Sequence, residues 1–161
     1  MKISKILRFL PPILMMIVIF SFSATPAEES TELSDGLSFR IVECVAMLPE
    51  ISWSDEELLQ KAQWLHVPLR KTAHFSEYAL LAILWLISLN TTKDSAKKRW
   101  LTVFLVCAAY AGIDEWHQRF VPGRNGNLVD ICIDSAGAMA GILLYCVTSK
   151  KIMRLFAKNK T

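Results

Sequence analysis

The sequence predicts an all-α integral membrane protein: a bundle of four transmembrane helices with both termini on the cytoplasmic side. Hydrophobic residues make up 53% of the 161 residues and charged residues only 20%, against about 45–50% and about 25% in a soluble domain. The apolar residues fall into four stretches, and the basic residues gather beside them. This composition excludes a disordered chain and a disulfide-stapled miniprotein, and the length indicates one domain.

The four apolar stretches are residues 9–24, 73–89, 100–113 and 128–147. A spanning helix needs about 20 residues, with roughly 17 as the lower limit, so the second and fourth stretches qualify directly. The first qualifies if Lys5 and Arg8 extend their charges to the interface. The third qualifies if its helix continues through residues 114–120. Each stretch is expected to be helical because backbone groups in lipid must bond internally.

The distribution of charge predicts the orientation. Residues 28–70 hold nine acidic and three basic residues. Twelve of the 18 basic residues lie before the first stretch, between the second and third, and after the fourth; they are Lys2, Lys5, Arg8, Lys93, Lys97, Lys98, Arg99, Lys150, Lys151, Arg154, Lys158 and Lys160. The positive-inside rule then puts both termini in the cytoplasm of a multi-pass cell-membrane protein.

These stretches divide the chain into four parts. Residues 1–27 form an N-terminal transmembrane helix, residues 28–70 an extracytoplasmic amphipathic region, residues 71–148 a three-helix core with a polar cluster at its outer face, and residues 149–161 a basic cytoplasmic tail. A cleaved signal peptide is the alternative for the first part. Pro26 directly before Ala27 weakens the best cleavage position, so we expect a retained helix that acts as a signal anchor.

The extracytoplasmic region has two amphipathic segments. Ile41, Val45 and Leu48 recur at helical spacing, and Ser54 followed by Glu57 has the spacing of a capping box. We expect two short helices that lie on the outer membrane surface or, alternatively, pack only on the protein.

The sequence contains no recognisable cofactor or nucleic-acid signature. Its four cysteines form neither a CxxC pair nor a cluster with histidine, so a structural zinc site is not expected. No motif supports a divalent cation, although Asp130 and Asp134 are candidates to hold one. Basic runs interleaved with aromatic residues are absent, which argues against nucleic acid.

Polar residues line one stripe at the outer end of each core segment. On a helical wheel, Arg70, Lys71, His74, Glu77 and Tyr78 share about 120° of the second segment. Asp114, Glu115 and Gln118 lie on the polar face of the third segment, which is followed by a turn containing Pro122, Gly123 and Arg124. The fourth segment aligns Asp130, Asp134, Gly137 and Gly141. The two glycines have the small-xxx-small spacing that lets helices approach closely.

Charged residues in a membrane are costly, at about 2.5–3.5 kcal/mol each at a helix centre on insertion scales. A single buried ion pair needs no explanation beyond tying helices together. A cluster drawn from three segments at one depth favours a functional site instead, because intramembrane ionisable groups usually mark one.

Three motifs resemble the VanZ-like family, in order and over about residues 35–148. They are Arg70-Lys71-x-x-His74-Phe75-x-x-Tyr78, Asp114-Glu115-x-x-Gln118-x-Phe120-x-Pro122-x-Arg124 and Asp130-x-x-x-Asp134-x-x-Gly137-x-x-x-Gly141. The resemblance implies a small multi-spanning membrane protein. The family's namesake is associated with low-level resistance to teicoplanin, a lipoglycopeptide. By resemblance, the functional set is Lys71, His74, Tyr78, Glu115, Gln118, Arg124, Asp130 and the position of Asp134, where the family usually has asparagine.

We consider three functions. The first is binding an amphiphilic envelope ligand (a lipid, a lipid-linked precursor or a lipoglycopeptide) at the outer leaflet, with Arg70, Lys71 and Arg124 gripping a phosphate or carboxylate. The second is an intramembrane hydrolase or transferase acting on a lipid-linked substrate. Its catalytic candidates are His74, Glu115, Asp130 and Asp134. The third is a small transporter subunit, for which four helices are few unless the protein forms an oligomer.

Overall fold

The computed structural model describes residues 6–90, 92 and 94–158, and the regular elements in these ranges are all α-helices. They are α2 (Leu10–Ser23), α3 (Ala27–Ala46), α4 (Asp55–Leu89), α5 (Ala96–Gln118) and α6 (Leu128–Lys158). The all-α prediction is confirmed. Helix α5 ends at Gln118, two residues before the predicted end.

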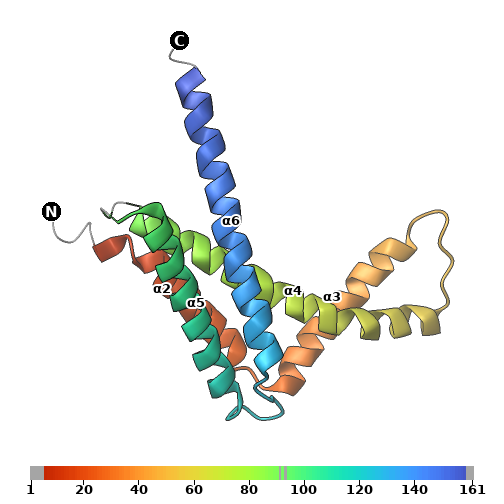
Figure 1. Cartoon of the computed structure of the whole chain (residues 1–161). Helices are drawn as coiled ribbons and strands as arrows, with labels where there is room; N and C mark the ends of the chain where they lie inside the picture. The colour runs from red at the N-terminus through yellow and green to blue at the C-terminus, as the bar shows by residue number, and fades with distance from the viewer. Residues whose placement is uncertain (1–5, 91, 93, 159–161) are drawn as a thin grey trace.

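Four of these helices form a bundle around an apolar core. Helices α2 and α5 run side by side toward the α5–α6 turn, from which α6 returns (Figure 1). Ser88 Oγ donates to the Arg8 carbonyl over 2.7 Å, so the end of α4 lies beside the start of α2. The core consists of Ile19, Tyr78, Leu81, Ala82, Leu86, Val103, Cys107, Ala111, Ala138 and Ile142.

Helices α4 and α6 approach each other closely along the predicted glycine stripe. A Cβ on Gly137 would collide with the carbonyl oxygen of Phe75, and one on Gly141 with that of Ala79. A side chain at either position would therefore force the two backbones apart. This close packing sets the outer half of α4 directly against the acidic residues of α6.

Helix α3 and the first half of α4 project from the bundle as an arm (Figure 1). The capping box at Ser54 and Glu57 is present and starts α4. Two short helices were expected here, but the second is continuous with the following span, since α4 runs unbroken from Asp55 to Leu89. Pro68 lies inside α4 without ending it. The other helix, α3, has 20 residues.

By length and composition, α4 and α6 are apolar enough to cross a membrane. Helices α2 and α3 pass the same test only together, across a 101° bend. Alone, the 14 residues of α2 cover roughly 21 Å, against about 30 Å of hydrocarbon. Helix α5 carries charged residues at both ends, which leaves too short an apolar run. Two or three candidate spans are thus found among the described residues, against the four predicted from the sequence.

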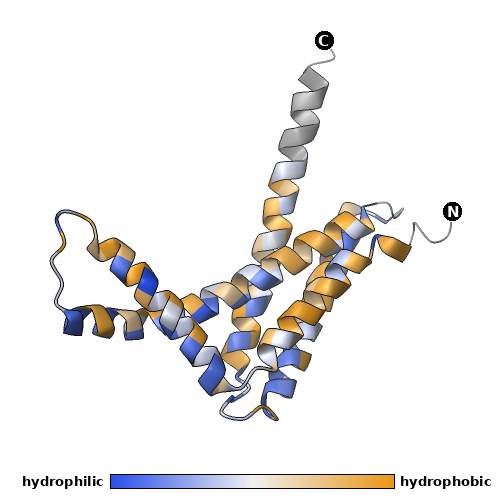
Figure 2. Ribbon diagram, turned by 180° about the vertical axis from the view of Figure 1, so that it is seen from behind, coloured by the Kyte–Doolittle hydropathy of each residue, from blue (hydrophilic) through white to orange (hydrophobic). Residues whose placement is uncertain are grey.

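Part of the charge pattern lies outside the described residues. Lys2, Lys5, Lys93 and Lys160 fall there, as do the side chains of Lys150, Lys151, Arg154 and Lys158. Within the described part, the start of α2, the end of α4 and the start of α5 share one end of the bundle (Figure 1). Hydrophilic residues gather at the opposite end, around the α5–α6 turn (Figure 2).

Candidate functional site

A polar cavity of about 190 Å³ lies at the end of the bundle where α5 ends and α6 begins. Its walls come from the middle of α4, the end of α5, the α5–α6 turn and the first turns of α6. Nine of the residues singled out from the sequence line it: Arg70, Lys71, His74, Glu115, Gln118, Gly123, Arg124, Asp130 and Asp134. At this size it accommodates a headgroup rather than a whole drug-sized ligand.

The register of α4 determines which of its side chains reach the cavity. His66, Arg70 and His74 recur every fourth residue and so lie on one face of the helix. Val67 and Lys71 flank this row. The sequence analysis missed His66 and Val67 because they precede the apolar stretch, and the unbroken α4 brings them in. It also missed the remaining wall residues Asn125 and Ile133.

One ion pair joins the two walls of the cavity. Lys71 Nζ lies 2.7 Å from Asp130 Oδ1, with both side chains partly exposed. Glu115 is buried, and its Oε2 accepts a 2.7 Å hydrogen bond from the backbone N–H of Asn127, which fixes the α5–α6 turn. Both acidic groups therefore have partners within the protein.

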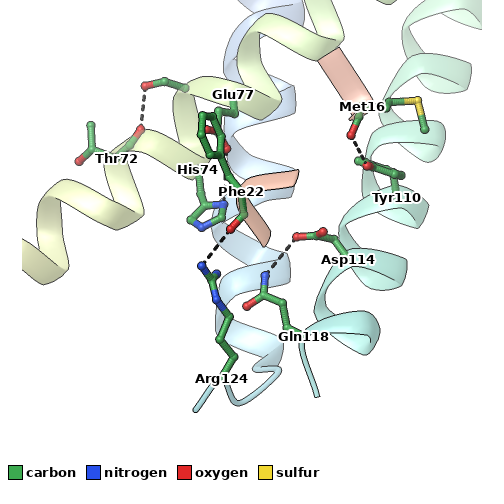
Figure 3. Close-up of polar contacts among 10 residues, drawn as sticks. Met16, Phe22, Thr72, His74, Glu77, Tyr110, Asp114, Gln118 and Arg124 are labelled. Carbon is green, nitrogen blue, oxygen red and sulfur yellow. Dashed lines mark hydrogen bonds and ion pairs between the residues drawn. The ribbon is translucent and has the colours of Figure 1, made fainter. Parts of the chain in front are cut away.

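Arg124 is held by the backbone of α2. Its Nε donates to the Thr25 carbonyl over 2.8 Å and its Nη2 to the Phe22 carbonyl over 2.9 Å (Figure 3). These carbonyls lie at the end of α2, where an arginine is a favourable cap. The side chain is only 7% exposed, and its Nη1 has no hydrogen-bond partner. Burial, to which the like charge of Arg70 adds, lowers the pKa of Arg124.

The turn that carries Arg124 depends on glycine. Gly123 has a φ of +73°, and a Cβ there would lie 3.0 Å from Ala27 Cβ. Pro122 accepts a 3.1 Å hydrogen bond from the Ala27 N–H, which ties the turn to the start of α3. The turn residues thus fix Arg124 between α2 and the cavity.

A second, mostly apolar groove adjoins the polar cavity. It has a volume of about 300 Å³ and lies between α3 and α4, with the end of α2 closing it. Arg70, His74 and Arg124 line both spaces. The apolar wall comes from Phe22, Leu33, Leu37, Leu69 and Ala73. A polar and an apolar compartment therefore meet at three basic side chains.

Three predicted site residues lie outside the polar cavity. Glu77 lines the apolar groove, where its Oε2 lies 3.6 Å from His74 Nδ1. Tyr78 is fully buried in the core, with its ring centroid 6.2 Å from that of Tyr110. Asp114 is also fully buried and accepts a 3.1 Å hydrogen bond from Gln118 Nε2 (Figure 3). Tyr78 and Asp114 line neither space, so these two residues support the site from behind.

The acidic residues do not form an evident metal site. In the ranges that the structure describes, no three His, Cys, Asp or Glu side chains are placed to hold a metal ion. Asp130 is paired with Lys71, and Asp134 lies one turn further into the bundle.

These features define an α-helical membrane protein with a polar cavity at one end of its bundle and an apolar groove beside it. The model of the VanZ/LLP1 family matches residues 9–150. The chain belongs to this family, as the resemblance implied. No curated protein and no solved structure matches it.

Proposed function

We propose that this VanZ-like protein binds an anionic amphiphile of the cell envelope. The headgroup occupies the polar cavity and the apolar portion lies in the groove between α3 and α4. One observation carries the proposal: Arg70, His74 and Arg124 line both spaces. A ligand that fills both must be polar at one end and apolar at the other.

Two guanidinium groups without an ion-pair partner among the described residues favour an anionic headgroup. Lys71 is neutralised by Asp130, and Arg124 bonds only to neutral carbonyls. Among the described residues, none forms a salt bridge with Arg70 or Arg124. A guanidinium with an unused, buried N–H is a strong donor to phosphate or carboxylate. The unpaired Arg124 Nη1 and Arg70 are therefore the anion-binding groups.

The location follows from the orientation predicted by the basic residues. With both termini cytoplasmic, the α5–α6 turn and the cavity lie at the outer face of the cell membrane. Envelope lipids and lipid-linked precursors present anionic headgroups there. Teicoplanin also acts at this face, so a role in glycopeptide resistance remains a proposal of the same kind.

A second candidate function is hydrolysis or transfer on a lipid-linked substrate. The observation that favours it is His74, which faces both spaces and has the Glu77 carboxylate 3.6 Å from its Nδ1. A histidine beside a carboxylate is a common general base, and this pair would act as one once the contact shortens to a hydrogen bond on substrate binding. Turnover of a labelled lipid-linked wall precursor by the purified protein, lost in His74→Ala, tests this candidate. Transport is not favoured by any specific observation.

The binding proposal is tested with hexadecyl phosphate and hexadecanoate, both single-chain anionic amphiphiles. Full-length protein is purified, and native mass spectrometry measures the affinity of each. We expect Arg70→Gln to weaken binding of both by about 10- to 100-fold, because a hydrogen bond to a charged group contributes about 1.5–3 kcal/mol.

The matched control is Arg40→Gln, which removes an exposed arginine of α3 far from the polar cavity. Its affinity should equal that of the wild type. Hexadecanol, which has the same chain without charge, should bind weakly to all variants. Equal affinities for the wild type and Arg70→Gln would refute the anion-binding role of the cavity.

A further inference from the structure

Asp134 differs in its surroundings from Asp130, although the two lie one turn apart on α6. Asp130 is partly exposed and paired with Lys71. Asp134 is 1% exposed, and its Oδ1 has no hydrogen-bond partner. Of the residues that the structure describes, none forms a salt bridge with it. Yet Asp134 is part of the wall of the polar cavity, so its carboxyl borders the space that a headgroup would occupy.

The groups around Asp134 do not stabilise a negative charge. An isolated carboxylate out of water is so costly that such a group takes up a proton instead. The acidic groups that act on Asp134 come from every helix packed against it: Glu77 of α4, Asp114 and Glu115 of α5, and Asp130 of α6. Tyr78 of α4 is a further titratable group close enough for its charge and that of Asp134 to interact. The cations Arg70, Lys71 and Arg124 and the imidazole of His74 share the cavity, but none pairs with it.

Resting on the proposed function, we infer that Asp134 is a protonated carboxyl that donates a hydrogen bond to the headgroup and makes the cavity selective for a phosphoryl group. Arg70, Arg124 and Asp134 then present donors from three elements: α4, the α5–α6 turn and α6. A carboxylate is planar, whereas the three terminal oxygens of a phosphate monoester point in three directions, so each can accept from a donor on a different element. A carboxyl kept neutral by its site so that it can donate is chemically well precedented.

The first test is spectroscopic and needs no ligand. Infrared difference spectra compare wild type with Asp134→Asn in phosphatidylcholine nanodiscs at neutral pH. We expect the wild type to show the carbonyl stretch of a protonated carboxyl, shifted by deuterium exchange and missing in the variant. The matched control Asp35→Asn, at an exposed position of α3, should leave this band unchanged. A spectrum in which Asp134→Asn removes only carboxylate bands would overturn the inference.

The second test measures selectivity between hexadecyl phosphate and hexadecanoate. Asparagine can still donate through its amide, so Asp134→Asn should keep the preference for the phosphate, whereas Asp134→Leu should lose about tenfold of it. Binding of the phosphate by the wild type should weaken at alkaline pH as Asp134 ionises. In Asp134→Asn this weakening should be smaller. His74 and the other titrating groups are present in both proteins, so the difference between the two pH dependences can be assigned to Asp134.

The outcomes separate this inference from the proposed function. If both probes bind equally and Arg70→Gln weakens both, the anionic-amphiphile site stands and the role of Asp134 is refuted. If Asp134→Asn loses phosphate binding as fully as Asp134→Leu, a hydrogen-bond donor at position 134 does not account for the binding, and the inference is again refuted. If the wild type binds neither probe, the proposed function fails, and with it the donor role of Asp134.

Discussion

Lys71 Nζ lies 2.7 Å from Asp130 Oδ1 and joins α4 to α6 across the mouth of the polar cavity. Because both side chains are partly exposed, the pair contributes little to stability, within about 0–1 kcal/mol. The pair holds Lys71 against Asp130 and leaves Arg70 as the cation that α4 contributes to the polar cavity without a salt-bridge partner among the described residues.

Asp130→Asn should therefore have a small effect on folding and a large one on ligand selection. We expect the midpoint of thermal unfolding to change little. The affinity for hexadecyl phosphate should increase by roughly tenfold, because the released Lys71 becomes available to the phosphate. Lys71→Gln, which also breaks the pair, should leave that affinity closer to the wild type. A large loss of stability in both variants would show that the pair is structural.

The contact between Gly137 and Phe75 predicts a strong packing effect. Gly137→Ala should destabilise the protein by about 1–3 kcal/mol, because the added Cβ collides with a backbone carbonyl that has no room to yield. Unfolding in a graded detergent mixture measures the difference. Gly112→Ala is the matched control, since a Cβ there meets nothing within 4 Å. Glycine is unfavourable inside a helix, so this variant should be neutral or more stable.

A side chain at Gly123 is also expected to lower stability, in this case by straining the turn that carries Arg124. With a φ of +73° and Ala27 Cβ 3.0 Å from an added Cβ, Gly123→Ala should cost about 1–2 kcal/mol. It should also weaken binding of hexadecyl phosphate, because Arg124 moves with the turn. If Gly123→Ala left both stability and affinity unchanged, the turn would not position Arg124. Gly36→Ala in α3, where a Cβ has open space, serves as the control.

The predicted orientation determines from which side of the membrane a reagent can reach the cavity. In a background without the exposed Cys44 and Cys132, Asn125→Cys should react with a membrane-impermeant maleimide added to intact cells. Asn90→Cys, at the opposite end of the bundle, should react only after the cells are opened. The reverse pattern would place the cavity in the cytoplasm and remove the envelope ligand from consideration.

The sequence alone predicted correctly those features that depend on a single helix. The apolar runs gave the all-α class, and the stripe at Arg70, Lys71 and His74 follows from helical geometry. The same wheel also placed Tyr78 in the stripe, but Tyr78 packs in the core because α5 covers that part of α4. A helical wheel predicts the direction in which a side chain points, but not which other helix packs against it.

The apolar groove could not be predicted from the sequence. Its wall includes Leu33 and Leu37, which reach α4 only because the chain bends by 101° between α2 and α3. Thr25 and Pro26 mark a break there, but its angle is set by tertiary contacts, among them the bond from Arg124 to the Thr25 carbonyl. The continuous α4 was missed for a related reason. The predicted boundary between residues 70 and 71 followed the change from polar to apolar residues, whereas α4 runs unbroken from Asp55 to Leu89.

The most direct measurement is an experimental structure of the full-length protein with hexadecyl phosphate bound. The account predicts density for the phosphoryl group in contact with Arg70 and Arg124 Nη1, and density for the alkyl chain along Leu33, Leu37 and Leu69. A ligand bound only at the outer surface of the bundle, with an empty polar cavity, would contradict it.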